Sequence, residues 1–231
     1  MLSVIIPTLN AEDELPRAMF PLVGAVVRGR VKEVIVSDGG STDGTLDVVE
    51  AAGAHLVAGE RGRGPQLASG AREAKGDWLL FLHADTVLET GWDEEVSKFL
   101  EQVEAGRFRS SEIAAAFRFT LDDFSGWARF LETMVALRCA ILRLPYGDQG
   151  LLINRRLYEK LGGYRDMPLM EDVDLVRRIG RRRLVMLRSR AVTSPDRYIR
   201  DGFAARMLRN FTCLTLYYLR VPPRLIARIY Q

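Results

Sequence analysis

The stretch GDWLLFLHADT (residues 76–86) decides the fold. Its apolar run ends abruptly in polar residues, which is typical of a buried strand that presents functional side chains at its end. Shorter apolar runs precede it and alternate with helical patterns; the predicted strands are residues 3–7, 33–38, 55–58 and 77–83, and the predicted helices are residues 11–27, 43–52 and 65–74. This alternation predicts a parallel sheet with crossover helices.

Beyond the fourth predicted strand the strict alternation ends. The predicted elements there are a helix over 92–104, a strand over 113–121, a helix over 125–142, a strand over 150–154, helices over 156–161 and 171–179, and a strand over 184–187. No obvious linker or repeat interrupts the chain. We therefore expect one α/β domain over residues 1–231, with a mostly parallel central sheet flanked by helices.

Composition limits the class of protein. The chain is 48% hydrophobic and 27% charged, as in ordinary globular proteins, and Cys139 and Cys213 lack a partner motif, which fits a reducing compartment. The N-terminal apolar run has no basic leader and meets Pro7 after a few residues, so we do not expect a signal peptide. No stretch has the roughly 20 uncharged apolar residues of a membrane span. These features predict a cytoplasmic protein.

Charge is distributed unevenly along the chain. Residues 177–231 carry fourteen Arg and no Lys against Asp196 and Asp201, so this part is strongly basic and the remainder is acidic. Such a basic part is expected to face an anionic group. Nucleic acid is a poor partner, because the arginines are not interleaved with a recognisable reading module.

The basic C-terminal segment, residues 203–231, is predicted to form amphipathic helices. In residues 203–220 the spacing places apolar residues on one face and Arg206, Arg209 and Arg220 on another; the apolar residues are Phe203, Met207, Phe211, Leu214 and Tyr218. One interpretation is a helix that packs this apolar face on the domain. The other is a peripheral helix at the inner face of the membrane.

Polar clusters follow the first two predicted strands. PTLN (residues 7–10) with Glu12 follows the first, and SDGGSTDGT (residues 37–45) follows the second. The carboxyl ends of parallel strands are where open α/β sheets bind ligands. Neither segment is a GxGxxG or a P-loop motif, so a dinucleotide cradle or P-loop is disfavoured. A capped turn is the alternative for residues 39–44.

The fourth strand presents His83, Ala84 and Asp85 at its end. A carboxylate in this place can bind Mg²⁺ or Mn²⁺, which proteins often hold through one or two carboxylates plus substrate phosphates. His83 is a candidate second ligand, although a packed, satisfied histidine is at least as common at a strand end.

Taken together, the segments SVIIPTLNAEDEL, EVIVSDGGSTDGT and GDWLLFLHADT resemble the family 2 glycosyltransferases of the GT-A fold, over nearly the whole chain. The resemblance implies a nucleotide-binding half (residues 1–105), an acceptor and catalytic half (residues 106–202) and the C-terminal helices. By position, the implied nucleotide-binding residues are Pro7, Thr8, Asn10, Glu12, Asp38 and Ala84, and the implied metal ligands are Asp85 and His83. Gly39 and His83 depart from the family pattern, since many members have an Asp at each position.

Later motifs also resemble the family. The turn at residues 162–164 and the run MEDVDL (residues 170–175) match its Gly-Gly-aromatic turn and acidic helix start, so Asp172, with Glu171 beside it, is the implied general base that takes the acceptor proton. The alternative is that Glu171 and Asp172 only complement a helix dipole.

Three further segments supply candidate residues for the substrate. The loop YGDQG (residues 146–150) makes Asp148 and Gln149 candidates for the sugar and acceptor side. Arg63 and Gln66 begin a helix whose N-terminus favours anions, so they are candidates for the nucleotide; a solvated basic turn is the alternative. Arg197, in residues 194–201, is a candidate for closing over the diphosphate.

We therefore expect an inverting, metal-dependent transferase that moves a sugar from a nucleotide diphosphate donor, most simply a UDP-hexose, to a hydroxyl acceptor. The acceptor is open between a lipid-linked and a small soluble molecule. LHADT (residues 82–86) and GDQG (residues 147–150) resemble a small bacterial subset of the family that is described as associated with radical-enzyme and selenium-related genes. A nucleotidyltransferase of similar fold and a non-catalytic nucleotide-binding or membrane-surface protein are the alternatives.

Overall fold

The computed structural model describes residues 1–230, so that of the predicted domain only Gln231 lies outside the described residues. The helices and strands, in chain order, are β1 (Leu2–Thr8), α1 (Leu15–Val27), β2 (Val31–Asp38), α2 (Thr45–Ala51), β3 (His55–Ala58), α3 (Arg63–Glu73), β4 (Trp78–Phe81), β5 (Thr86–Leu88), α4 (Trp92–Glu104), β6 (Ala114–Leu121), α5 (Gly126–Leu142), η1 (Gly147–Gln149), β7 (Leu151–Asn154), α6 (Arg155–Lys160), α7 (Glu171–Ile179), η2 (Arg181–Arg183), β8 (Leu184–Thr193), α8 (Asp196–Asp201), α9 (Phe203–Tyr218) and α10 (Pro223–Tyr230).

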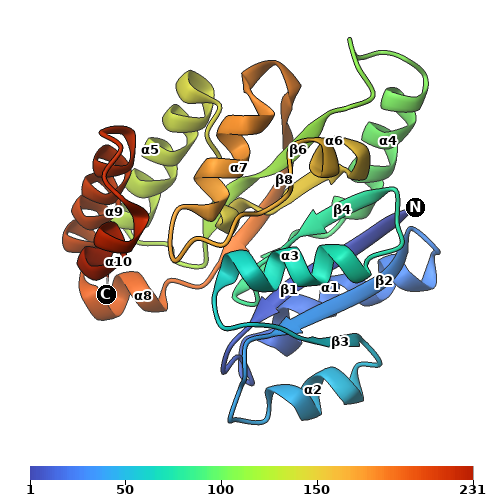
Figure 1. Ribbon diagram of the computed structural model, residues 1–231, viewed down its shortest axis with the longest axis horizontal. Coiled ribbons are helices and arrows are strands. Elements are labelled where there is room, and N and C mark those ends of the chain that lie inside the picture. The colour runs from blue at the N-terminus through green and yellow to red at the C-terminus, as the bar shows by residue number, and fades with distance from the viewer. Residues whose placement is uncertain (231) are drawn as a thin grey trace.

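The strands form one twisted sheet with helices on its faces (Figure 1) in the order β3-β2-β1-β4-β7-β6-β8-β5. The predicted parallel arrangement is confirmed for β3, β2, β1 and β4. The far half is mixed, because β7 runs antiparallel to both β4 and β6, and β5 runs antiparallel to β8. The α/β fold with a central sheet is therefore confirmed, but only the N-terminal half of the sheet is uniformly parallel.

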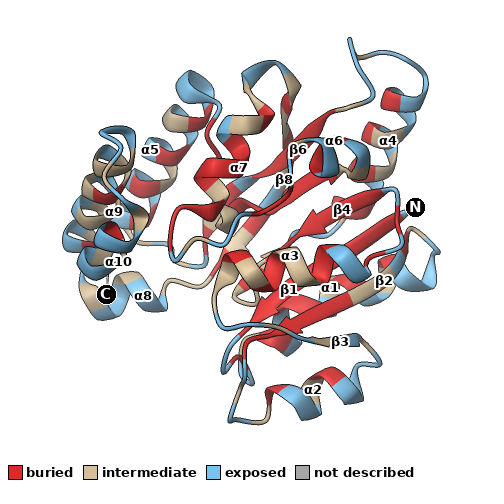
Figure 2. Ribbon diagram, in the orientation of Figure 1, coloured by how far each residue is buried: buried red, intermediate tan, exposed pale blue. Residues whose placement is uncertain are grey.

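Alternating side chains of the strands feed two cores. Along β1, Val4 and Ile6 face a cluster that includes residues of α1 and α4, whereas Ile5 faces a cluster that includes residues of α3, α6 and α7. This follows from the two-residue period of a strand, which sends neighbouring side chains to opposite faces. A third, smaller core lies between the end of β6 and α5. Figure 2 shows the buried strands between partly exposed helices.

The parallel register brings the two predicted polar clusters together. Thr8 pairs with Asp38, so the last residues of β1 and β2 lie side by side at the same edge of the sheet. The β4 strand ends at Phe81 beside Ile5, and its continuation carries His83 and Asp85 to the same edge. Helices α8, α9 and α10 gather near α5 (Figure 1).

Candidate active site

The polar residues at the ends of β1 and β2 form a closely bonded unit, which we call the strand-end cluster: Thr8, Asn10, Glu12, Asp38 and Ser41. Both carboxylate oxygens of Asp38 are engaged. Oδ1 accepts hydrogen bonds from the hydroxyls of Thr8 (2.9 Å) and Ser41 (2.5 Å), and Oδ2 accepts from the backbone N–H groups of Gly40 (2.9 Å) and Ser41 (2.8 Å). Burial alone would raise the pKa of Asp38, but these hydrogen bonds together lower it below its ordinary value.

Other predicted nucleotide-binding residues hold the same loop together. The side-chain oxygen of Asn10 accepts from the backbone N–H of Thr42 (2.9 Å), and the carboxylate of Glu12 accepts from that of Gly44 (2.9 Å). The buried amide of Gln66 donates to the backbone carbonyls of Thr8 (2.5 Å) and Ser37 (2.9 Å). The structure therefore shows how the loop over residues 39–45 is fixed at the sheet edge.

A second group of predicted residues lines a cavity of about 100 Å³, which we call the central cavity. These residues come from separate elements: Arg63 (α3), His83 and Asp85 (after β4), Asp148 (η1), Asp172 (α7) and Arg197 (α8). The others lie beside it or in the strand-end cluster: Pro7 is buried in β1, Ala84 packs on the core, and Gln149 and Glu171 are buried.

Asp85 and His83 follow the carboxyl end of β4, where the sequence pattern places them. The Asp85 carboxylate lies 3.6 Å from the guanidinium of Arg197, the residue predicted to close over a diphosphate. A Cβ at Gly147 would approach the Nε2 atom of His83 to 2.6 Å, so only glycine lets the η1 loop come this close. Burial, and secondarily the charge of Arg63, lowers the pKa of His83 to about 4.

These residues fit a divalent cation that is shared with a substrate. Within residues 1–230 no three His, Cys, Asp or Glu side chains come together as a complete metal site. Asp85 supplies a hard oxygen donor, and Mg²⁺ and Mn²⁺ sites of this kind are completed by substrate phosphates rather than by an all-protein cage. His83 faces the same cavity as a nitrogen donor.

The two predicted catalytic carboxylates have different surroundings. Asp172 faces the central cavity, where its Oδ2 atom accepts a hydrogen bond from the backbone N–H of Gly147 (2.8 Å) and its Oδ1 atom accepts from that of Val173 (2.7 Å). Glu171 is buried beneath it and forms an ion pair with Arg63 (3.2 Å). Burial is the main cause that raises the pKa of Glu171. Asp172 is thus placed to meet a ligand, whereas Glu171 anchors Arg63.

Asp148 is the least satisfied group of the site. Its Oδ1 atom is buried and has no hydrogen-bond partner among the described residues. Burial raises the pKa of Asp148 to about 6, against the opposing effect of Arg138. The neighbouring Gln149 differs, because both polar atoms of its side chain are hydrogen-bonded. Its amide N–H₂ donates to the backbone carbonyl of Phe117, and its Oε1 atom accepts from the guanidinium of Arg138 and the backbone N–H of Tyr146. An unpaired carboxylate oxygen in a cavity indicates a group that is completed by a ligand.

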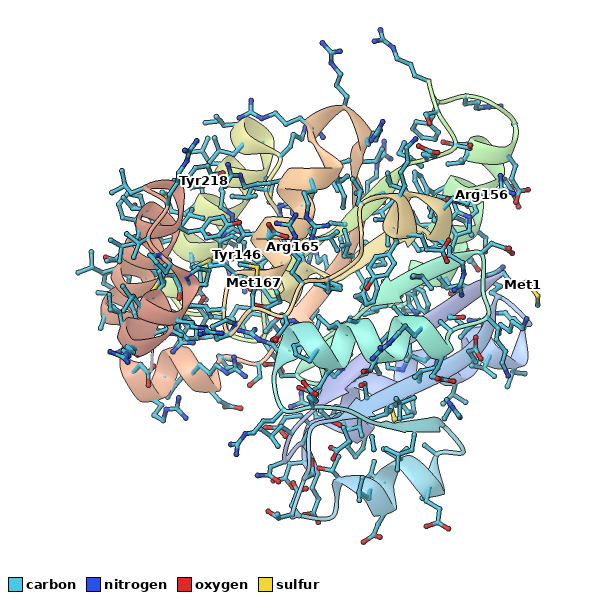
Figure 3. All side chains as sticks on the ribbon, viewed as in Figure 1. Met1, Tyr146, Arg156, Arg165, Met167 and Tyr218 are labelled. Atoms are coloured by element: carbon cyan, nitrogen blue, oxygen red, sulfur yellow. The ribbon has the colours of Figure 1, made fainter. Side chains whose placement is uncertain are left out.

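Sequence reasoning missed several residues of the cavity wall: Tyr146, Thr193, Tyr198, Arg206, Asn210 and Tyr230. The guanidinium of Arg138 lies over the ring of Tyr146, 3.4 Å from the ring centre. Tyr146 is half-buried, whereas Tyr218 of α9 is exposed; both are labelled in Figure 3. The adjacent GDQG motif was the signal that could have included Tyr146. Nothing in the sequence pattern indicated that α9 and α10 reach the cavity.

The apolar face predicted for α9 is packed only in part. Phe203 and Met207 pack on the third core, whereas Phe211 and Tyr218 are exposed. Arg206, which the helical spacing places on another face, is only 6% exposed, because its guanidinium binds the Asp201 carboxylate (2.9 Å) and the Tyr230 hydroxyl (2.7 Å). A paired charge can be buried where an unpaired one cannot, so helical spacing alone does not show which arginine is buried.

The fold and the site together describe an α/β protein with a polar sheet edge and a carboxylate-lined cavity. The sequence model of the family described as "Glycosyl transferase family 2" matches residues 3–162. The chain therefore belongs to glycosyl transferase family 2, a family of glycosyltransferases.

Individual relatives are more distant. A glucosyl-3-phosphoglycerate synthase from Mycolicibacterium paratuberculosis is 33% identical over 95 residues, which cover 37% of this chain and only 29% of that protein. The structure of Staphylococcus aureus TarS residues 1–349 aligns with a TM-score of 0.64 at 15% identity, covering 99% of this chain and 69% of the other.

The structure of glucosyl-3-phosphoglycerate synthase from Mycobacterium tuberculosis, in complex with Mn²⁺, UDP and phosphoglyceric acid, aligns with a TM-score of 0.60 at 19% identity. The alignment covers 96% of this chain and 79% of the other. At these identities the structural comparisons establish the GT-A fold.

Proposed function

We propose that this protein transfers a hexose-type sugar from a UDP-linked donor to a hydroxyl acceptor, with inversion at the anomeric carbon and with Mn²⁺ or Mg²⁺ as cofactor. The observation that carries the proposal is the meeting of Asp85, Asp148 and Asp172 in one cavity next to the strand-end cluster. The UDP and Mn²⁺ named for the neighbouring synthase support the donor and the cation.

Each group has a separate task in the proposed reaction. The strand-end cluster, with Pro7, Ala84 and Gln66 around it, holds the base and ribose, and Arg63 and Arg197 face the diphosphate. Asp85, with His83 beside it, would hold the cation, which neutralises charge on the departing diphosphate as a Lewis acid. Asp148, with its unpaired Oδ1 atom, accepts a hydrogen bond from a hydroxyl of the sugar, and Gln149 positions its loop.

Asp172 removes the proton of the acceptor hydroxyl as the acceptor oxygen forms its bond to the anomeric carbon. The bond from that carbon to the diphosphate breaks, and the nucleoside diphosphate leaves with the electron pair. Positioning of the two reactants in line accounts for much of the rate in such a step. The hydrogen bond from the Gly147 N–H keeps Asp172 oriented, and the neighbouring Glu171 holds Arg63 in place through their ion pair.

The acceptor is proposed to be lipid-linked, and the enzyme to work in the cytoplasm at the inner face of the membrane. Arg206, Asn210 and Tyr230 support this, because they bring the C-terminal helices to the wall of the cavity. Among residues 1–230, no helix combines the length and apolarity needed to cross a bilayer, so the proposed contact is peripheral. The LHADT and GDQG motifs support placement in the bacterial subset linked to radical-enzyme and selenium-related genes.

Ligand-induced stabilisation tests the donor site. A ligand that binds only the native state at 100 times its Kd raises the free energy of unfolding by about 2.7 kcal/mol. We expect UDP and UDP-hexoses with Mn²⁺ to raise Tm, and EDTA or Asp85→Ala to abolish the rise. Asp77→Ala is the matched control, because Asp77 is an exposed carboxylate at the opposite end of β4. A nucleoside triphosphate preference would favour a nucleotidyltransferase, and no response to any nucleotide would overturn the proposal.

A further inference from the structure

Helix α5 carries two apolar stripes, and only one of them packs against the protein. Ala128, Leu131, Val135 and Cys139 are buried in the third core. A second set lies on the outside, spaced three and four residues apart, and we call it the outer stripe: Trp127, Phe130, Met134, Leu137 and Ile141, which are between 44% and 59% exposed. Residues so spaced share one face of a helix, and the stripe runs for about 20 Å along α5.

The apolar surface extends beyond α5. Phe124, just before the helix, is 93% exposed, and the rings of Trp127 and Phe130 form an edge-to-face pair in solvent. Tyr198, Phe203 and Met207 pack on the third core and thereby fasten α8 and α9 beside α5. These helices add further exposed apolar side chains: Ile199, Leu208, Phe211, Leu225 and Ile229. Exposed apolar side chains gathered on neighbouring helices indicate an interaction site.

Positive charge predominates on the C-terminal helices beside this surface. Arg200, Arg220, Arg224 and Arg228 are exposed on or next to α8, α9 and α10, and beyond Asp196 the described chain contains only one further acidic residue, Asp201. Asp201 is itself paired with Arg200, Arg206 and Arg209. Acidic residues of the surface, Asp122 and Asp123, lie just before the start of α5. The charge of α8 to α10 is therefore almost uniformly basic, and an anionic partner is favoured there.

A groove beside the outer stripe repeats the combination of apolar lining and basic rim. It has a volume of about 380 Å³ between α5, β6 and β8, and its apolar lining includes Phe119, Val135 and Met186. Arg118 and Arg143, both exposed, stand at the same groove, and its carboxylate, that of Glu132, is paired with Arg129 (2.7 Å). An apolar slot whose rim carries guanidinium groups that are unpaired among the described residues suits a molecule with a hydrocarbon chain and an anionic head.

We propose that the outer stripe of α5 lies in the interface of an anionic phospholipid bilayer, with the arginines of α8 to α10 on the headgroups. A second copy of this chain is the competing occupant, since the 3–4 spacing is also that of a helix-pairing seam. A two-fold interface places the same surface against itself, which would oppose one basic end with another. A bilayer that contains anionic lipid attracts the same charges, by about 1 kcal/mol for each Lys or Arg near the surface.

This inference extends the membrane contact of the proposed function to α5, which the sequence pattern did not single out. It also has a specific probe, because Trp78 and Trp92 are buried whereas Trp127 is 55% exposed. We expect vesicles of equal parts phosphatidylcholine and phosphatidylglycerol to bind the protein and to shift Trp127 fluorescence to the blue. Vesicles of phosphatidylcholine alone should bind more weakly, and salt should weaken binding to the mixture.

The variants test whether the outer stripe is responsible. Phe130→Ser with Leu137→Ser should lower the partition coefficient at least about tenfold. Val27→Ser with Leu56→Ser, which removes two exposed apolar side chains from α1 and β3 at the other end of the molecule, should leave it unchanged. Phe130→Leu with Leu137→Met should keep binding, and Trp127→Phe should keep binding while removing the shift. Cooperative unfolding of every variant is confirmed first.

Several outcomes would overturn the proposal. These are an absence of binding to the mixed vesicles, an equal loss in the Val27 and Leu56 variant, or light scattering that shows a dimer with Trp127 already shielded in the absence of lipid. The last result would assign the stripe to a second copy. No nucleotide or acceptor is present in these assays, so failure here is distinct from failure of the proposed reaction.

Discussion

The strand-end cluster and the central cavity lie at the same edge of the sheet but differ in how far their polar groups are satisfied. Asp38 accepts four hydrogen bonds from its own neighbours, whereas the Oδ1 atom of Asp148 is buried without one among the described residues. A satisfied network holds one geometry, while an unpaired buried group is costly until a partner arrives. The first region is therefore a preformed scaffold on which the base and ribose are proposed to bind, and the second is where sugar binding and chemistry are expected.

The largest effect should come from the cavity. Asp172→Asn keeps the shape of the side chain but removes the proposed proton acceptor, so kcat should fall by about 10²–10⁴-fold with little change in KM. Tm should fall modestly, because the amide N–H₂ must face the backbone N–H of either Gly147 or Val173. Steady-state kinetics with the donor and acceptor, together with thermal unfolding, measure these quantities.

The neighbouring carboxylate supplies the control. Glu171→Gln disturbs the buried ion pair with Arg63 and should lower Tm more than Asp172→Asn does. Equal losses of kcat in the two variants without a difference in Tm would contradict the separate roles that the structure gives them.

A smaller effect is expected on breaking the strand-end cluster. In Asp38→Asn an amide N–H₂ would face hydroxyl and N–H donors, so the free energy of unfolding should fall by about 3 kcal/mol at neutral pH. Because the folded-state pKa of Asp38 is lowered, its stabilising effect is present above the ordinary pKa of Asp and is lost as the pH falls through the folded-state pKa. Denaturant titrations between pH 7 and pH 3 should therefore show the two proteins converging in acid.

If Asp38→Asn were as stable as the parent protein at pH 7, the cluster would not be a scaffold. UDP binding by the variant adds a second measurement, since a loop that has lost its fixed shape should bind the donor more weakly even where Tm allows folding.

The sequence was sufficient for the elements that depend on local pattern. The strands and helices of the N-terminal half were predicted within a few residues, because two-residue and 3.6-residue periods with Gly turns leave little choice there. Strand β8 extends to Thr193, beyond the predicted Leu187. The extension was missed because it begins with the exposed Arg188 and Arg190 and contains no apolar run. The short β5 and α8 were missed because each has too few residues to show a period.

The candidate site was predictable where it follows strand ends and unpredictable where it depends on distant packing. Register alone brings Thr8 to Asp38, and the end of β4 carries His83 and Asp85 to the same edge. The cavity wall from Arg206, Asn210 and Tyr230 depends on ion pairing that buries an arginine. No single-segment pattern contains that information, because the partners lie on α8 and α10.

The smallest expected effect is a change in the free energy of unfolding that has the opposite sign in the central cavity and in the strand-end cluster. Asp148→Asn removes a buried charge, so it should raise the free energy of unfolding by about 2 kcal/mol at pH 8 even as it weakens sugar binding. The folded-state pKa of about 6 lies above the ordinary Asp value, so the stability associated with Asp148 is full below pH 4 and is lost as the pH rises through 6.

The advantage of the Asn variant should therefore vanish toward pH 4 and reach its plateau above pH 7, opposite to the trend at Asp38. The other charged groups that act on Asp148 are Arg138, Arg63, Asp172 and Asp85, and all remain in the variant, so the comparison isolates one carboxylate. Thermal unfolding across this pH range, with donor KM in parallel, is the measurement. A lower Tm for Asp148→Asn at pH 8 would mean that the carboxylate is satisfied in solution and that the cavity, like the strand-end cluster, is scaffold.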